Sequence, residues 1–316
     1  MRAVLNRIFF TTASIISLSS VASAVTLPEN WKQPAAEVVV WFETSGTSSW
    51  GSVTPDFDYQ GMSAGAFQWN IGKGSLRDNI LKDISKSVFE ASMPVYGKKF
   101  HTALHDTTNV ALEYVRGFQT FRRPDLCKKG RGAEWTNDGK VFSQEISALM
   151  ATKEVKAKQQ KRIDADVKAG WEYASWWARA KRGPEASPTF VEVLFFTDTL
   201  NFNGEWKQLA NYEKVKSFKG GRSNKEVLSQ IATYLSSDIP DQLQIDEARK
   251  NTQLWGSINP TDDQTDLLAF SYLVAINLNK EGAKQFRFNT ISRRGTIIFN
   301  DGFVNGERKK FSYPES

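Results

Sequence analysis

Two carboxylic acids in one turn-rich segment have the types and spacing for acid–base chemistry. Glu43 closes an apolar run that begins at Val38, and Asp58 follows fifteen residues later in a polar turn next to Gly61. Apolar neighbours raise the pKa of a carboxyl group, whereas a polar turn keeps a carboxylate ionised. Hydrolysis of a glycosidic bond needs one neutral acid and one ionised partner. The pair therefore predicts glycosidase chemistry, although the spacing alone is a weak signal.

The element that carries Glu43 allows two interpretations. Residues 28–43, PENWKQPAAEVVVWFE, contain three consecutive valines, which favour a strand. Pro34 at a position like the first of a helix, with Ser45 and Gly46 as a stop, favours a short buried helix instead. Residues 47–74 are rich in Gly, Ser, Thr and Asp, and this composition predicts loops with a hairpin around Asp58.

The remainder of the chain is predicted to be mainly helical. The expected helices cover 75–92, 97–105, 108–120, two segments of 140–182 that separate near Gly170, a nearly all-apolar segment from Pro188 to Asn203, 223–236 and 262–285. The tail TIIFNDGFVNG contains an Asn-Asp-Gly turn between apolar runs, which predicts a small hairpin. The predicted fold class is therefore mainly α with a small β-hairpin element.

The order of residues around the two acids resembles the catalytic segment of chitosanases in the lysozyme superfamily. In that family a Phe-Glu-(Asn/Thr)-Ser run ends a helix and a glycine-rich hairpin with an aspartate follows; this chain has FETS at 42–45 and FDYQGMSAG at 57–65. The segment is also similar to lysozyme-like proteins of phages and secretion systems with a DGQGxSFGALQWNxGQGSL-type signature. Weaker similarities lie in FFTDTLNFNG at 195–204 and RRGTIIFNDGFVNG at 293–306.

The resemblance implies a lysozyme-like, two-lobed α+β fold with a cleft, in which the segment 28–43 is a helix. By resemblance, Glu43 is the general acid, Asp58 is the base that activates water, and Ser63 matches a hydroxyl residue that helps to hold that water. The candidate sugar-contacting residues are Gln60, Gln68, Trp69 and Asn70, with Trp69 stacking on a sugar ring. An inverting reaction would separate the two carboxyl groups by ~6.5–9.5 Å, and a retaining one by ~5 Å.

Charge and two departures from the chitosanase pattern favour peptidoglycan as the substrate. Gln60 replaces the family's arginine, and Tyr59 replaces the glycine after the aspartate. Chitosan is a polycation, whereas the formal net charge of this chain is +6, so peptidoglycan with its acidic stem peptides fits better. Chitosan is the alternative polysaccharide partner. A non-catalytic cell-wall-binding protein with the same fold is the alternative of another class.

Residues 1–24 predict a secretory signal peptide. Arg2 and Arg7 precede an apolar stretch to Leu18, and Ala22-Ser23-Ala24 supplies a cleavage pattern. A single hydrolase domain of two lobes would then cover 25–316, in the periplasm or outside the cell. We expect no stable membrane insertion and no nucleic-acid partner. An inhibitor or immunity-type partner is an open alternative.

The other reactive side chains predict less chemistry. His101 and His105 have the spacing of two metal ligands on a helix, but Thr102 stands where a zincin has its glutamate. We therefore expect surface histidines, no metal site and no cofactor. Cys127 is the only cysteine and is expected to be partly buried and inert. The tryptophans of the lysine-rich segment are expected to lie in the core; they are Trp171, Trp176 and Trp177.

Overall fold

The computed structural model describes residues 26–44, 46, 49–56, 60–121, 133–203, 210–240, 242–279 and 283–314. The predicted signal peptide, Asp58 and Cys127 lie outside these residues. The described chain is mainly helical, with small antiparallel sheets, which confirms the predicted mainly-α class. Of the described helices, none combines the length and the apolar character that crossing a bilayer requires.

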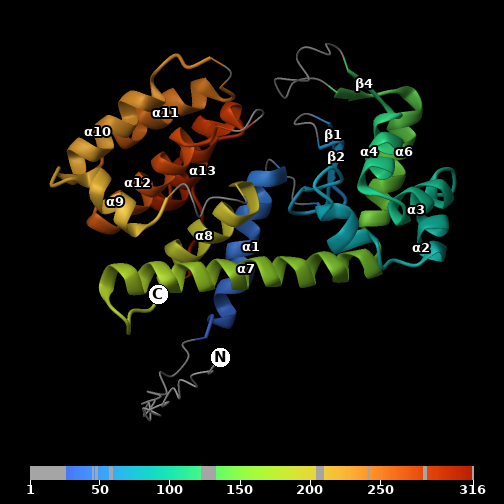
Figure 1. The fold of residues 1–316 in the computed structure, drawn as a ribbon, viewed down its shortest axis with the longest axis horizontal. Helices are drawn as coiled ribbons and strands as arrows, with labels where there is room; N and C mark the ends of the chain where they lie inside the picture. Colours follow the sequence, from blue (N-terminus) through green and yellow to red (C-terminus); the bar gives the residue numbers. More distant parts are fainter. Residues whose placement is uncertain are drawn as a thin grey trace, which may run out of the picture.

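The elements form two groups joined by one long helix (Figure 1). Helix α1 (Glu29–Thr44) lies beside α8 (Phe190–Asn203) of the second group. The chain then enters the first group with the antiparallel sheet of β1 (Val53–Pro55), β2 (Met62–Ala64) and β3 (Trp69–Asn70). The rest of the first group is η1 (Arg77–Leu81), α2 (Lys86–Ser92), α3 (Gly97–His105), α4 (Thr108–Arg116), the pair β4 (Gln119–Phe121) and β5 (Ala133–Trp135), and α6 (Asn137–Met150).

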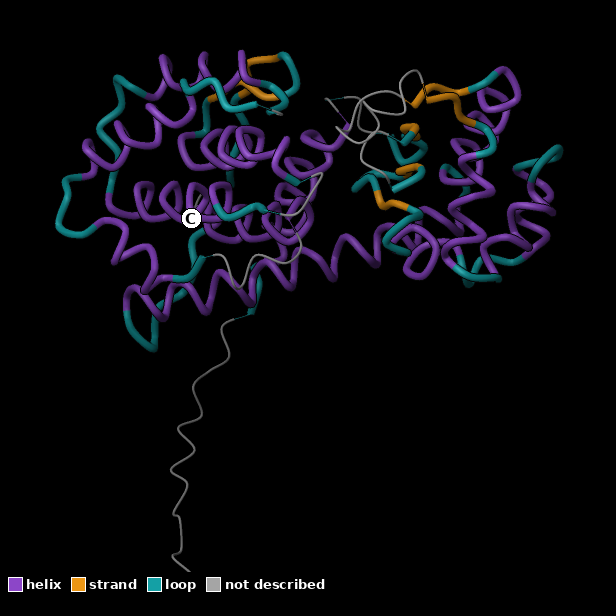
Figure 2. Tube along the Cα trace, turned by 45° about the horizontal axis from the view of Figure 1, so that its top comes forward, coloured by secondary structure: helices purple, strands orange, loops and turns teal. Residues whose placement is uncertain are grey.

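Helix α7 (Lys153–Arg182) runs along both groups, and Figure 2 shows a small set of strands in each. The second group contains α8 (Phe190–Asn203), α9 (Tyr212–Lys219), α10 (Asn224–Leu235), α11 (Ile245–Trp255), α12 (Asp262–Ile276), η2 (Lys284–Phe286), α13 (Arg287–Phe299), and the hairpin β6 (Gly302–Val304) and β7 (Glu307–Lys309).

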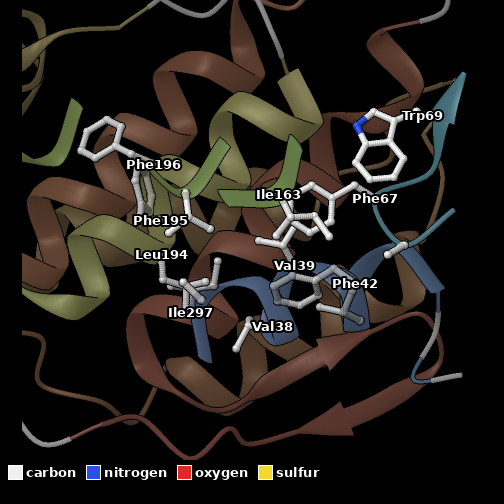
Figure 3. Close-up of a cluster of buried hydrophobic side chains, with 14 of the residues drawn as sticks. Val38, Val39, Phe42, Phe67, Trp69, Ile163, Leu194, Phe195, Phe196 and Ile297 are labelled. Atoms are coloured by element: carbon white, nitrogen blue, oxygen red, sulfur yellow. The ribbon is translucent and has the colours of Figure 1, made fainter. Parts of the chain in front are cut away.

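The valine-rich segment is a helix, α1, and not a strand. Its buried side chains recur at helical spacing and belong to Trp31, Ala35, Val38, Val39 and Phe42. Burial of each large apolar side chain contributes about 1.5–3 kcal/mol, which exceeds the small helix penalty of valine. Figure 3 shows three of these side chains in one cluster with residues from α7, α8 and α13. The helix begins at Glu29, so Pro34 lies inside it and not at its first position.

The predicted break near Gly170 is wrong. Helix α6 ends at Met150, and Thr152 caps the start of α7, so the two helices separate at residues 151 and 152. Gly170 lies within the 30 residues of α7. A Cβ atom there would lie 2.1 Å from Oγ1 and 2.9 Å from the backbone nitrogen of Thr197 in α8. The glycine therefore permits close approach of two helices.

The tryptophans of α7 divide by helical face. Trp171 and Trp177 are buried, as predicted, whereas Trp176 is 40% exposed. Helical periodicity places residue 176 on the side of α7 that is turned away from these two. The prediction of a core position is therefore confirmed for two of the three tryptophans.

Tertiary contacts also change other predicted elements. The helix expected over 75–92 divides into η1 and α2, residues 119–121 form β4, and the helix expected over 262–285 ends at Ile276. The terminal hairpin exists, but its turn is Asn305-Gly306 and not Asn300-Asp301-Gly302. Asn300 instead ends α13 in the left-handed conformation, with φ of 51°. Asn-Gly is the dipeptide that suits a tight hairpin turn best.

The contact at Gly170 generates a stability prediction. Gly170→Ala should lower the free energy of unfolding by about 1–3 kcal/mol, because the new methyl group overlaps Thr197. The expected change is opposite in sign to the effect of helix propensity, which favours alanine over glycine by about 1 kcal/mol. Chemical denaturation measures the difference. The exposed α7 variant Lys168→Ala is the control and should stay within about 0.5 kcal/mol of wild type. An unchanged or higher stability of Gly170→Ala would contradict the packing argument.

Candidate functional site

The carboxyl group of Glu43 is held at the end of α1 by two other helices. One of its oxygens, Oε1, accepts hydrogen bonds from Asn201 Nδ2 of α8 at 2.9 Å and from Arg293 Nη2 of α13 at 2.7 Å. The Glu43 side chain is 15% exposed. Within the described part of the chain, no hydrogen bond reaches the second oxygen, Oε2. The group is therefore fixed through one oxygen and can use the other for chemistry.

Arg293 connects Glu43 to a second, fully buried carboxylate. Its Nη2 lies 2.5 Å from Asp198 Oδ1, and Arg294 Nε lies 3.7 Å from Asp198 Oδ2. The guanidinium of Arg293 also lies over the rings of Phe42 and Phe202, at 4.9 and 4.3 Å from their centroids. The guanidinium of Arg293 thus lies between two carboxyl groups inside the protein, and its pairing with the Asp198 carboxylate makes the burial of both charges tolerable.

Burial and Arg293 act on the Glu43 carboxyl in opposite directions. Burial, the larger effect, raises the pKa of Glu43 above its ordinary value, because removal from water penalises the charged form. The charge and hydrogen bond of Arg293 pull this pKa downward, and the net direction is upward. A raised pKa is the property that a general acid near neutral pH requires.

The three-stranded sheet carries Ser63 and Asn70 side by side. Ser63 lies in β2, buried, and pairs with Thr54 of β1 and Asn70 of β3. The Asn70 Oδ1 atom accepts a hydrogen bond from the backbone N–H of Lys73 at 2.9 Å. Asn70 is half-buried, and its contact with a sugar, like the role of Ser63, stays a prediction.

The side chain of Gln68 is committed to the hairpin itself. It has a left-handed backbone, with φ of 50°, donates to the Gly65 carbonyl at 2.9 Å and accepts from Thr54 Oγ1 at 2.7 Å. The backbone carbonyl of Gln60 accepts from the amides of Met62 and Gly72. These bonds shape the turn. The predicted sugar contacts of both glutamines stay predictions.

Trp69 lies in the core in this structure. Its side chain is 5% exposed and stacks on Phe67, with ring centroids 5.8 Å apart (Figure 3). A ring used for stacking on a sugar needs an exposed face. The burial of Trp69 therefore weighs against its predicted stacking role.

The segment that carries Asp58 is held at both of its ends. Gln119 accepts from the Asp56 amide and donates to the Gly61 carbonyl, both at 2.7 Å, and Arg116 lies 3.3 Å from the Asp56 carboxylate. Asp58 itself lies outside the described residues. Its distance from Glu43, and hence the choice between inverting and retaining geometry, stays a prediction.

Sequence reasoning missed the partners of Glu43. Asp198 and Asn201 lie in FFTDTLNFN, and Arg293 lies in RRGTIIFN, the two segments with the weaker resemblance. The available signal was Asp198 within the nearly all-apolar segment of α8, because a buried charge requires a partner. The identity of that partner depends on tertiary structure.

The described residues offer no cluster of three or more His, Cys, Asp or Glu side chains that could hold a metal ion. His101 and His105 stack on one another at 4.2 Å between ring centroids. A groove of about 1080 Å³ runs along another face of α1 and is lined by residues such as Trp41, Gln160 and Lys309. Glu43 is not among its lining residues, so the predicted cleft at Glu43 stays a prediction.

Comparisons with protein-family models, with curated proteins and with solved structures find no match to this chain. The geometry around Glu43 and the resemblance of the short segments are therefore the basis for a function.

The raised pKa of Glu43 predicts a pH-dependent effect on stability. A carboxyl with a higher pKa in the folded state destabilises the fold as pH rises through that pKa, because the unfolded chain loses its proton first. Glu43→Gln removes this group. The stability of the variant relative to wild type should therefore increase from about pH 4 upward, by about 1.4 kcal/mol for each pH unit between the two pKa values.

Denaturant unfolding over a pH series measures this difference. Glu37→Gln, an exposed position on the same helix, is the control for the loss of a carboxyl group from α1. If the stability of Glu43→Gln relative to wild type falls as pH rises, the effect of Arg293 on the pKa of Glu43 is larger than the effect of burial.

Proposed function

We propose that the chain is a glycoside hydrolase with a lysozyme-like, two-lobed fold that cleaves the glycan strand of peptidoglycan. The observation that carries the proposal is the state of Glu43. Its side chain is partly exposed, its pKa is raised by burial, and both of its hydrogen bonds reach the same carboxyl oxygen. The resemblance of residues 42–76 to the chitosanase segment supports the same role.

In this proposal Glu43 donates the proton on Oε2 to the glycosidic oxygen as the bond to the anomeric carbon breaks. Asn201 and Arg293 then stabilise the carboxylate that remains, because both donate to Oε1. Asp58, between β1 and β2 in the sequence, takes a proton from the water that attacks the anomeric carbon. The leaving alcohol carries the proton from Glu43, the new hemiacetal carries the remaining O–H of the water, and Asp58 holds the other water proton.

Peptidoglycan is preferred over chitosan because of charge. The excess of basic residues in the chain suits a polymer with carboxylate-bearing stem peptides and opposes a polycation. Secretion by a signal peptide, which would bring the protein to a cell wall, is part of the same proposal. A non-catalytic wall-binding protein would require no raised pKa at Glu43.

The test is digestion of purified peptidoglycan and of chitosan, followed by mass spectrometry of the released fragments. Wild type should release disaccharide-peptides, and Glu43→Gln should lower the rate by ~10²–10⁴-fold, the contribution expected of a general acid. Asp58→Asn should lower it similarly. Glu37→Gln is the matched control on α1 and should retain the wild-type rate.

Three other results would change the conclusion. Products from chitosan alone would replace peptidoglycan as the substrate. Unchanged activity of Glu43→Gln would remove Glu43 from the mechanism. Binding to cell walls with no product from either polymer would show a recognition protein and overturn the catalytic proposal.

A further inference from the structure

Three side-chain amides form a directed chain of hydrogen bonds that ends next to Glu43. Asn289 of α13 donates to Gln244 Oε1, and Gln244 Nε2 donates to Asn305 Oδ1 at 3.1 Å. Asn305 Nδ2 in turn donates to the backbone carbonyl of Phe42 at 2.8 Å. Gln244 and Asn305 each accept through the side-chain oxygen and donate through the nitrogen, and Asn289 donates the first bond of the chain. The chain therefore fixes the last turn of α1, where Glu43 lies.

The same chain begins on the helix that supplies the partner of Glu43. Asn289 and Arg293 are four residues apart in α13, so they lie on one face of that helix. Arg293 contacts the Glu43 carboxyl, and the amides connect Asn289 back to the carbonyl next to Glu43. The amide chain and the contact between Glu43 and Arg293 thus connect α1 and α13 at two places. The geometry of these two connections sets how α1 and α13 meet at the carboxyl group.

The turn that presents Asn305 is itself fixed. Asn305 and Gly306 have left-handed backbones, with φ of 56° and 86°, and the Gly306 amide donates to the Glu247 carboxylate of α11. Asparagine and glycine tolerate this conformation better than other residues. The Asn305 side chain thus donates to Phe42 from a turn that is itself hydrogen-bonded to α11.

We propose that Asn305 is a positioning residue for the general acid, acting through Phe42 to hold Glu43 against Arg293. This inference rests on the proposed function, in which Glu43 gives up a proton and Arg293 stabilises the product carboxylate. A small displacement of the end of α1 would lengthen the contact between Glu43 and Arg293. Misplacement of a catalytic group by about 1 Å can cost ~100-fold in rate.

Two variants separate the donated bond from the rest of the side chain. Asn305→Gly removes the amide and keeps the left-handed backbone, whereas Asn305→Asp keeps an acceptor for Gln244 and loses the donor to Phe42. Asn300→Gly is the matched control. Asn300 also has a left-handed backbone and donates to a backbone carbonyl, that of Phe311, at 2.8 Å.

Kinetics on purified peptidoglycan give the first readout. Both Asn305 variants should lower kcat at least ~10-fold with KM within about twofold of wild type, because the displaced group acts in the reaction and not in binding. Asn300→Gly should leave kcat unchanged even where its thermal stability falls by a similar amount. Equal kcat losses in Asn305→Gly and Asn300→Gly would overturn the positioning role.

The second readout does not depend on activity. Carbon NMR of the Glu43 carboxyl, assigned with Glu43→Gln, should give a higher pKa in Asn305→Gly than in wild type, because Glu43 loses part of its contact with Arg293. An unchanged or lower pKa would overturn the inference. If wild type hydrolyses no glycan, the proposed function fails, while the titration still decides whether Asn305 positions Glu43.

Discussion

The structure depends on one buried charge cluster, in which Arg293 lies between Asp198 and Glu43. Arg293 is 3% exposed and Asp198 is fully buried, so neither charge has water to stabilise it. Loss of one partner from such a cluster typically costs about 3–5 kcal/mol. The cluster forms only when α1, α8 and α13 meet, although Glu43 and Arg293 are 250 residues apart. The packing of these helices and the state of the carboxyl group are therefore one constraint.

This cluster reconciles two opposite requirements. A general acid must hold its proton before the reaction, which burial favours, and must become a stable anion afterwards, which a cation favours. Arg293 serves both states because the Asp198 carboxylate, 2.5 Å away, opposes its positive charge when Glu43 is neutral. Because Asn201 and Arg293 both donate to Oε1 of Glu43, the stabilising groups lie on one side of the carboxyl group. The hydrogen-bond donors are thus arranged before any charge develops.

The sequence predicted what local pattern determines. The mainly-α class, α8 and the placement of Glu43 after an apolar run follow from short segments. The identity of the partners of Glu43 could not be predicted, because local sequence does not show which residue 250 positions away pairs with it. Gly170 appeared to be a helix breaker and instead permits contact with Thr197. The resemblance predicts that Gln68 contacts a sugar, which stays a prediction, and the hydrogen bond from its side chain to the Gly65 carbonyl is one that periodicity does not reveal.

The length of α7 has a consequence for how the chain can vary. Gln159 accepts from the Ala66 amide beside the sheet, and Gly170 contacts α8, so both anchors lie on one helix. The rise and turn of an α-helix separate them by ~16 Å and place them on nearly the same face. One inserted or deleted residue between them would rotate one anchor by about 100°. Related chains should therefore conserve the number of residues in this stretch even where its side chains differ.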